Sequence, residues 1–176
     1  TTPAVTFHFQ APTICDLDDD GVDEIVVGTA SDSVWAFNGN KSRVPGFPVK
    51  LNADLAGAIC AGDVDGDGRF ELFAQTKGLV GKAYLINHDG TIATGWPVNA
   101  KIETIFFTPS PALGDFNNDG KLECVVYTWV SGVAKINIFN YNGTNYPGWP
   151  KTTGTTFTDT SSLTVADVNG DGSLDV

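Results

Sequence analysis

The sequence contains no methionine, only two histidines and three cysteines, and its 10 basic residues stand against 21 acidic ones. His8 and His88 suggest neither a Ser-His-Asp nor a Cys-His constellation, so we expect the chain not to be an enzyme. The net charge of -11 and the pI near 4.3 argue against nucleic acid as a partner, because phosphate binding needs clustered Lys and Arg. The scarcity of histidine and cysteine and the excess of acidic residues therefore favour a binding or structural role.

Long apolar runs and helical periodicity are missing as well. No stretch approaches the roughly 18 apolar residues of a membrane helix, so we expect no membrane insertion. No sustained helical period is present, so helix content should be close to nil. The absence of a signal peptide and of an initiating methionine fits a mature secreted segment whose targeting region has been removed.

The cysteines at positions 15, 60 and 124 do not form a disulfide framework. Cys15 and Cys60 occupy places that hold small residues in other parts of the chain, so we expect small buried apolar residues there. One bridge with one leftover thiol is the alternative.

One acidic loop pattern occurs four times. The copies start at residues 16, 63, 115 and 167 and read D-L-D-D-D-G-V-D-E, D-V-D-G-D-G-R-F-E, D-F-N-N-D-G-K-L-E and D-V-N-G-D-G-S-L-D. Their spacings of 47, 52 and 52 residues are typical of a repeated supersecondary unit. These loops hold 16 of the 21 acidic residues (six, four, three and three), so the acidity is local.

The loop pattern predicts calcium binding. Calcium takes six to eight oxygen ligands at about 2.3 to 2.6 Å, and loop positions 1, 3 and 5 always carry a side-chain oxygen. Glycine at position 6 permits a sharp turn, and the varied residues at position 7 are expected if only the backbone carbonyl is used. The predicted ligands at positions 1, 3, 5, 7 and 9 are Asp16, Asp18, Asp20, Val22 and Glu24; Asp63, Asp65, Asp67, Arg69 and Glu71; Asp115, Asn117, Asp119, Lys121 and Glu123; and Asp167, Asn169, Asp171, Ser173 and Asp175.

Two other calcium-binding motifs and a simple turn fit the loops less well. An EF-hand needs a glutamate at position 12, where this chain has Val27, Ala74 and Val126. A dockerin needs paired helices, which the sequence does not predict. A solvated, Asx-rich turn would account for a single copy, but four copies in one register argue against it.

The residues around each loop predict four antiparallel strands per unit. A short strand precedes each loop, with Cys60, Ala112 and Thr164 three places before the first aspartate. Two apolar runs follow, at residues 25–27 and 34–37, 72–74 and 83–86, and 124–127 and 136–139, and we expect the first run of each pair to be a buried strand. Each pair leads to an Asn-Gly or Asp-Gly turn and then to a Gly-aromatic-Pro triplet, which we place on the outermost strand.

Units of about 50 residues with four strands are the size of a propeller blade, so the predicted fold is an all-β propeller segment; a β-solenoid is the alternative. We expect a single segment over residues 1–176, with three complete repeats and the start of a fourth. Such a segment cannot close alone, so we expect it to be part of a longer chain, with assembly of fragments into a ring as the alternative. The predicted parts are 1–10 as a strand of a preceding blade, then blades at 11–56, 57–108 and 109–160, and the start of a fourth at 161–176.

The loops that open onto strands, together with Gly95-Trp96-Pro97 and Gly148-Trp149-Pro150, resemble the FG-GAP or VCBS repeats of secreted propeller proteins, and the loops are similar to those of integrin α-subunit propellers. The resemblance implies calcium sites on the propeller rim, up to four here. Asn117 and Asn169 depart from it by lowering the ligand charge of loops three and four. The literal F-G and G-A-P tripeptides are also missing.

Modules of that family occur in adhesins, lectins and non-catalytic parts of extracellular enzymes. We therefore expect a calcium-stabilised extracellular module, secreted or at the cell surface, that binds a glycan or an extracellular protein. The alternatives are an accessory scaffold of a larger secreted enzyme or a calcium-dependent polysaccharide lyase, which the few scattered lysines disfavour.

The recurring Phe47, Trp96 and Trp149 should pack between blades, whereas Trp35, Tyr84 and Trp129 are candidates for an exposed face.

Overall fold

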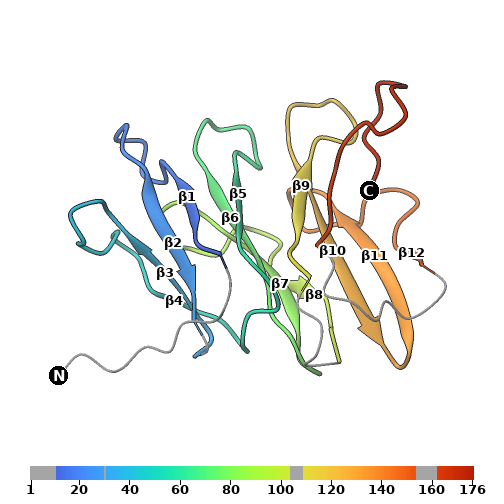
Figure 1. Cartoon of the computed structure of the whole chain (residues 1–176), viewed down its shortest axis with the longest axis horizontal. Helices are drawn as coiled ribbons and strands as arrows, with labels where there is room; N and C mark the ends of the chain where they lie inside the picture. The colour runs from blue at the N-terminus through green and yellow to red at the C-terminus, as the bar shows by residue number, and fades with distance from the viewer. Residues whose placement is uncertain (1–10, 30, 104–108, 154–161) are drawn as a thin grey trace.

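The computed structural model describes residues 11–29, 31–103, 109–153 and 162–176 (Figure 1). The predicted strand at 1–10, with His8, lies outside these residues. Across the described ranges the chain forms β-strands and no helix. This confirms the predicted all-β class.

Three antiparallel sheets of four strands follow one another along the chain, and each has its strands in chain order from the innermost to the outermost. Figure 1 shows them side by side without closure into a ring. The first contains β1 (Thr13–Cys15), β2 (Glu24–Gly28), β3 (Ser33–Phe37) and β4 (Val49–Lys50); the second β5 (Cys60–Gly62), β6 (Glu71–Gln75), β7 (Lys82–Ile86) and β8 (Val98–Asn99); the third β9 (Ala112–Gly114), β10 (Glu123–Val130), β11 (Val133–Phe139) and β12 (Lys151–Thr152).

The apolar runs form the two central strands of each sheet, as the alternation of turns and β-formers predicts. The turns that follow are closed by a backbone bond, for example from Gly90 N–H to the Asn87 carbonyl (2.9 Å) and from Gly143 N–H to the Asn140 carbonyl (2.8 Å). Thr164, predicted to lie on a short strand, is not in one; nearby Ala166 forms only an isolated bridge with Asp175.

The Gly-aromatic-Pro triplets lie in the turn before the outermost strand, so their predicted place on that strand was wrong. The reason is backbone conformation. Gly46, Gly95 and Gly148 have φ values of +87°, +91° and +82°, which no strand accommodates. Each triplet instead ends in a cis X-Pro bond immediately before β4, β8 or β12.

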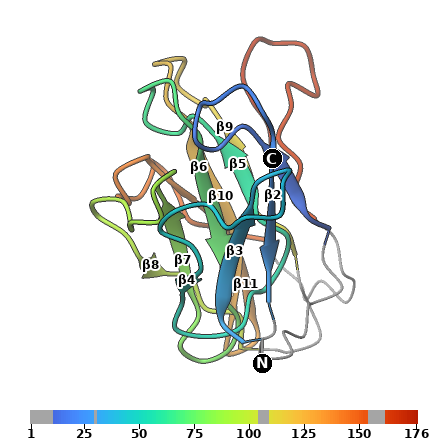
Figure 2. The same ribbon diagram turned by 90° about the vertical axis from the view of Figure 1, so that its left-hand side faces the viewer.

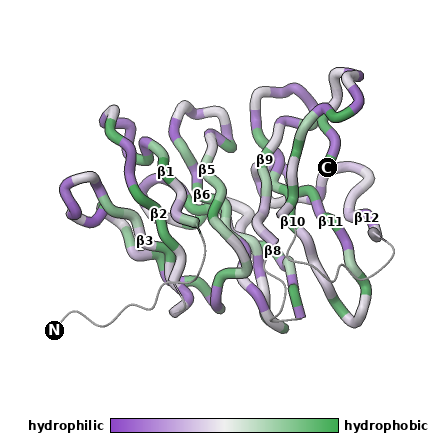
Figure 3. The backbone as a smooth tube through the Cα atoms, viewed as in Figure 1, coloured by the Kyte–Doolittle hydropathy of each residue, from purple (hydrophilic) through white to green (hydrophobic). Residues whose placement is uncertain are grey.

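Apolar side chains fill the space between neighbouring sheets. One cluster joins the first and second sheets through residues such as Leu17, Val34 and Tyr84, and another joins the second and third. Figure 3 shows hydrophobic colour along the central strands and hydrophilic colour in the loops. β6 is buried along its whole length, but Ile25 in β2 is 44% exposed, contrary to the prediction of a buried strand, because no described sheet covers that side.

Trp96 shows how the recurring aromatic joins two blades. Its ring makes edge-to-face contacts with Phe73 of the second sheet and Phe139 of the third, with centroids 5.5 and 5.9 Å apart. Its Nε1–H donates to the Tyr141 carbonyl at 2.9 Å. The prediction that this aromatic packs between blades is confirmed at Trp96.

The aromatic residues proposed for an exposed face behave differently. Tyr84 is only 6% exposed, and its hydroxyl donates to Asn52 Oδ1 at 3.0 Å, so its predicted place on an exposed face was wrong. Its side chain belongs to the core between the first two sheets. Trp35 and Trp129 are half-buried.

All three cysteines are free thiols; Cys15 is buried as expected, whereas Cys60 is only half-buried and its Sγ–H donates to the Pro111 carbonyl at 2.9 Å. Burial raises the pKa of Cys15 and of Cys60 to about 11 and that of Cys124 further from its ordinary value. Because the thiolate is the reactive form, these groups are inert at neutral pH.

Replacing Trp96 by Ala should lower the free energy of unfolding by about 3 to 5 kcal/mol, because it removes a large buried ring between two sheets. Trp149→Ala is the matched control, because Trp149 occupies the same place in the next repeat but is only half-buried. Urea denaturation of both variants measures the difference. Equal losses would show that Trp96 does not have the inter-blade role assigned to it.

Candidate metal centre

The four acidic loops lie at one end of the sheets, where the innermost strand turns into its neighbour. Loops one, two and three join β1 to β2, β5 to β6 and β9 to β10. Figures 1 and 2 show these loops together along the upper edge, with the β2–β3, β6–β7 and β10–β11 turns at the lower edge. The fold therefore gathers most of the negative charge at one end of the molecule.

Two positions of each loop have a left-handed backbone. At position 6, the glycines have φ values between +84° and +92°, as the sharp turn requires. Position 4 is also left-handed, which was not predicted from the sequence: φ is +62° at Asp19, +78° at Gly66, +58° at Asn118 and +77° at Gly170. The signal was available, because Asp, Gly and Asn are the residues that tolerate this conformation.

The aspartates at positions 1 and 5 shape the loop by accepting backbone hydrogen bonds. In every loop, one carboxylate oxygen of position 1 accepts the N–H of the position 6 glycine, at 2.9 to 3.0 Å. Oδ1 of position 5 accepts the N–H of position 7 at 2.8 to 2.9 Å. This repeated pattern holds the odd-numbered side chains in a fixed arrangement.

The acidic residue at position 9 closes the loop. One of its oxygens accepts the N–H of position 2, as from Leu17 to Glu24 (2.9 Å) and from Val64 to Glu71 (2.9 Å), and the same bond recurs in loops three and four. Glu24, Glu71 and Glu123 are almost completely buried. Position 9 was predicted from the sequence only as a ligand, so this second role is new.

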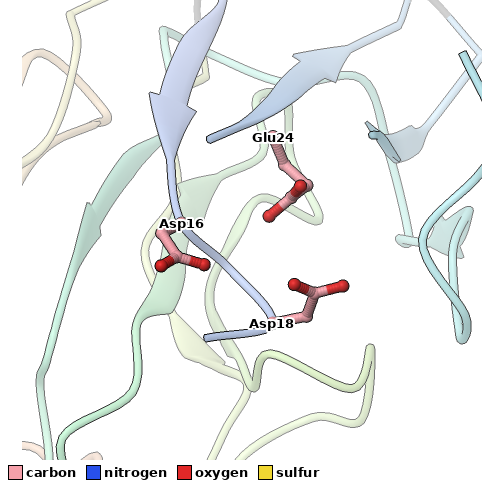
Figure 4. A group of neighbouring side chains, drawn as sticks. All are labelled: Asp16, Asp18 and Glu24. Carbon is pink, nitrogen blue, oxygen red and sulfur yellow. The ribbon is translucent and has the colours of Figure 1, made fainter. Parts of the chain in front are cut away.

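Carboxylates converge in the first two loops. Oxygens of Asp16, Asp18 and Glu24 lie within 4.8 Å of one another (Figure 4), and so do those of Asp63, Asp65 and Glu71. Thus the structure brings together positions 1, 3 and 9 of the predicted ligand sets in loops one and two. Asp20 and Asp67, predicted for the same sites, lie outside these groups of three and accept the position 7 N–H instead.

The charge of these groups is not offset by the protein. Among the described residues, the only ion pairs are Lys50 with Asp32 and Lys77 with Asp54, both away from the loops. Burial, and secondarily the charges of Asp65 and Asp67, raises the pKa of Glu71 to about 7. Burial is also the main cause that raises the pKa of Glu24 and of Glu123 above the ordinary value. An oxygen-only donor set with uncompensated negative charge fits a hard divalent cation such as calcium.

In loop three, an amide occupies the place that a carboxylate has in loops one and two. Asn117 Nδ2 donates to Asp119 Oδ2 at 3.0 Å and lies 3.4 Å from Glu123 Oε1, while Asn117 Oδ1 accepts the Asp119 N–H. The amide hydrogens thus partly satisfy the two carboxylates. Loop three therefore carries less uncompensated negative charge than loops one and two, and a cation would stabilise it less.

Loop four repeats the backbone bonds but is packed differently. Leu17 and Val64, at position 2 of the first two loops, are fully buried, whereas Val168 is 80% exposed. Asp175 at position 9 is half-buried instead of buried. The fourth set of predicted ligands therefore stands in a more solvated surrounding than the first three.

Side chains at position 7 contact the hairpin turn of their own blade. Arg69 Nη1 lies 3.0 Å from His88 Nε2, and Lys121 Nζ lies 3.8 Å from the centre of the Tyr141 ring. In loops two and three the position 7 side chain thus contacts the hairpin turn, a relation that was not predicted from the sequence.

Comparisons with known proteins agree with this repeat. The family model described as "FG-GAP-like repeat" matches residues 16–74 and 115–176. No curated protein matches the chain.

Two solved structures share the fold. The chain is similar to the biofilm matrix protein Bap1 of V. cholerae, with 20% identity and a TM-score of 0.55, over 98% of this chain and 35% of Bap1. It is also similar to BBS1N, solved in complex with ARL6DN, with 14% identity and a TM-score of 0.61, over 92% of this chain and 52% of BBS1N. The chain thus spans about a third and about half of these two proteins.

The raised pKa of Glu71 gives the ion-free protein a pH-dependent stability. Because folding favours the protonated carboxyl, this contribution is fully present below the unfolded pKa of about 4.5 and is lost as the pH rises through about 7. Urea denaturation in chelator should therefore show a lower free energy of unfolding at pH 8 than at pH 5. Glu71→Gln, which keeps an oxygen for the Val64 N–H, should reduce this difference; an unchanged pH profile would contradict the assignment.

Proposed function

The chain belongs to the FG-GAP-like repeat family, and from that membership we propose that it is a calcium-stabilised extracellular propeller module for adhesion or ligand binding. The observation that carries the proposal is the convergence of three carboxylates in each of the first two loops, with no basic side chain paired to them in the part of the chain that the structure describes. Such an arrangement is unfavourable unless a cation lies among the oxygens.

Calcium would be held by the loop positions that the structure places together. Asp16, Asp18 and Glu24 in loop one, and Asp63, Asp65 and Glu71 in loop two, would contribute side-chain oxygens. Calcium supplies two positive charges, which would offset the repulsion among these carboxylates. One oxygen of the buried glutamate accepts the position 2 N–H, and the other would bind the ion.

An extracellular setting fits the affinity expected of such sites. Calcium modules outside cells bind at roughly 0.1 to 1 mM. At about 1 mM free calcium, a site with a Kd of about 0.1 mM adds about 1.4 kcal/mol to stability, a contribution that vanishes at cytosolic calcium. Bap1 is a biofilm matrix protein, which is consistent with such a setting for a protein of this fold.

We propose a non-catalytic role and a glycan or an extracellular protein as the partner. His88 lies in a hairpin turn beside Arg69, which fits a structural role for that histidine. Within the described residues, no helix has the length and apolar character that crossing a membrane would require.

Removing calcium should destabilise the protein strongly. The two carboxylate sites of loops one and two would together contribute about 3 kcal/mol at millimolar calcium, and loops three and four would contribute less. The two sites alone correspond to roughly 6 to 12 °C in Tm for a chain of this size. Differential scanning calorimetry with 1 mM calcium and with excess chelator measures the shift. Magnesium at the same concentration is the control, because it prefers a smaller octahedral site. A Tm that does not change on chelation would refute calcium stabilisation.

The amide in loop three predicts a weaker site there. Asn117→Asp should raise the calcium affinity of that loop by about tenfold, because it replaces a hydrogen-bonding amide with a third charged ligand. The reciprocal change, Asp65→Asn in loop two, should lower affinity by a similar factor and serves as the matched comparison. Isothermal titration calorimetry measures both, and affinities that move the same way in the two variants would contradict the role given to position 3.

Glycan and protein partners are distinguished by binding experiments on the calcium-loaded protein within its natural chain. Binding to a broad glycan panel would support the first class. A protein partner that is retained after deglycosylation would support the second, and failure of both would oppose an adhesive role.

A further inference from the structure

We propose that a cavity between the second and third sheets binds an acidic saccharide through two lysines that have no acidic partner among the residues that the structure describes. The cavity measures about 420 Å³, and its lining includes Lys101 and Lys135. This volume is within the range of small-molecule sites and is much larger than one inorganic anion needs. The inference gives a ligand chemistry to the module proposed above, and it rests on that proposal only for its extracellular setting.

The β10–β11 hairpin supplies one wall. Thr128 is paired with Lys135 across the hairpin, and Val130 is paired with Val133. Because side chains alternate along a strand, these four residues and Asn137 lie on the same face of the hairpin. All five line the cavity.

Lys101 comes from the other side, in the segment that follows β8, and its backbone is fixed by both sheets. Its carbonyl accepts the Trp129 N–H at 3.0 Å, and the Glu103 N–H donates to the Trp129 carbonyl at 2.9 Å. The preceding carbonyl, of Ala100, accepts Gln75 Nε2–H at 2.9 Å. The ammonium group is thus carried on a preorganised backbone beside the hairpin, which reduces the cost of ordering it on binding.

Lys101 and Lys135 carry charges that no described acidic residue neutralises. Neither ammonium group has an ion pair or a hydrogen bond with any described residue, whereas Lys50 and Lys77 are paired with aspartates. The nearby carboxylate of Glu103 accepts the Ser131 N–H at 2.7 Å and does not line the cavity. In a chain of net charge -11, two unpaired cations in one concavity match a ligand that carries a carboxylate or a sulfate.

The remaining lining indicates a hydroxylated ligand. Asn137 Nδ2 donates to Thr128 Oγ1 at 2.8 Å, so the Thr128 hydroxyl proton and Asn137 Oδ1 are free to bind ligand hydroxyls. Asn99 adds another amide. Val130 and Val133, 38% and 44% exposed, offer apolar surface to the C–H groups of a sugar ring. The chain's acidic loops lie at the opposite end of the sheets from this hairpin tip (Figure 1).

The test is an NMR titration of the ¹⁵N-labelled chain in calcium with three probes: trigalacturonate, uncharged galactotriose and triglutamate. Trigalacturonate should shift the side-chain amide signals of Asn99 and Asn137, and the other two should bind at least about tenfold more weakly. Lys101→Gln with Lys135→Gln should weaken trigalacturonate binding at least about tenfold. The control, Lys41→Gln with Lys50→Gln, removes the same charge from exposed lysines of the first blade and should change affinity less than about twofold.

Equal binding of galactotriose would overturn the role of charge, and equal binding of triglutamate would overturn the saccharide class. The proposed site would be refuted if trigalacturonate did not shift the amide signals of Asn99 and Asn137, or if both double variants lost the same trigalacturonate affinity. The calcium-dependent Tm, recorded on the same samples, distinguishes failure of this inference from failure of calcium stabilisation, because the cavity residues take no part in the loops.

Discussion

Loops one and two each hold three carboxylates close together with no ion pair to a basic side chain among the described residues, and the backbone makes this possible. The position 9 carboxylate accepts the N–H of position 2, and the position 1 carboxylate accepts the N–H of the glycine at position 6. These bonds fix the positions of the carboxylate oxygens. The N–H groups, however, offer only partial positive charges, which do not balance the full negative charges of the carboxylates. Burial is the main cause that raises the pKa of Glu71, and the neighbouring carboxylate charges add to it. A divalent cation bound at this point would offset the negative charge of the carboxylates. The stability of the loops therefore depends on whether such a cation is bound.

The loops are also tied to the packing of the blades, so their order affects the whole segment. Leu17 and Val64, whose N–H groups the glutamates bind, place their side chains in the clusters between sheets. On the outer side, Arg69 and Lys121 contact the hairpin turns. Trp96 of the second blade donates a hydrogen bond to the carbonyl of Tyr141, which lies in the hairpin turn of the third blade. Direct contacts therefore connect the loops to the core and to the neighbouring repeat.

The sequence predicted the repeat, the all-β fold and the location of the loops because these follow from local patterns: Asp at fixed spacing, glycine at position 6 and apolar runs after each loop. It did not predict relations that need the third dimension. The second role of Glu24 depends on which N–H it faces, and the burial of Tyr84 depends on Asn52, 32 residues away. The exposure of Ile25 depends on which sheets surround β2. The lysine-lined cavity joins Lys101 to Lys135 from separate blades, and no sequence pattern links the two.

Calcium binding by the loops is tested most directly by crystallography at a wavelength with calcium anomalous signal. Crystals grown in millimolar calcium should show anomalous peaks in loops one and two, each with side-chain oxygens of positions 1, 3 and 9 at about 2.3 to 2.6 Å. Peaks absent from both loops, or present only on exposed aspartates elsewhere, would contradict the account.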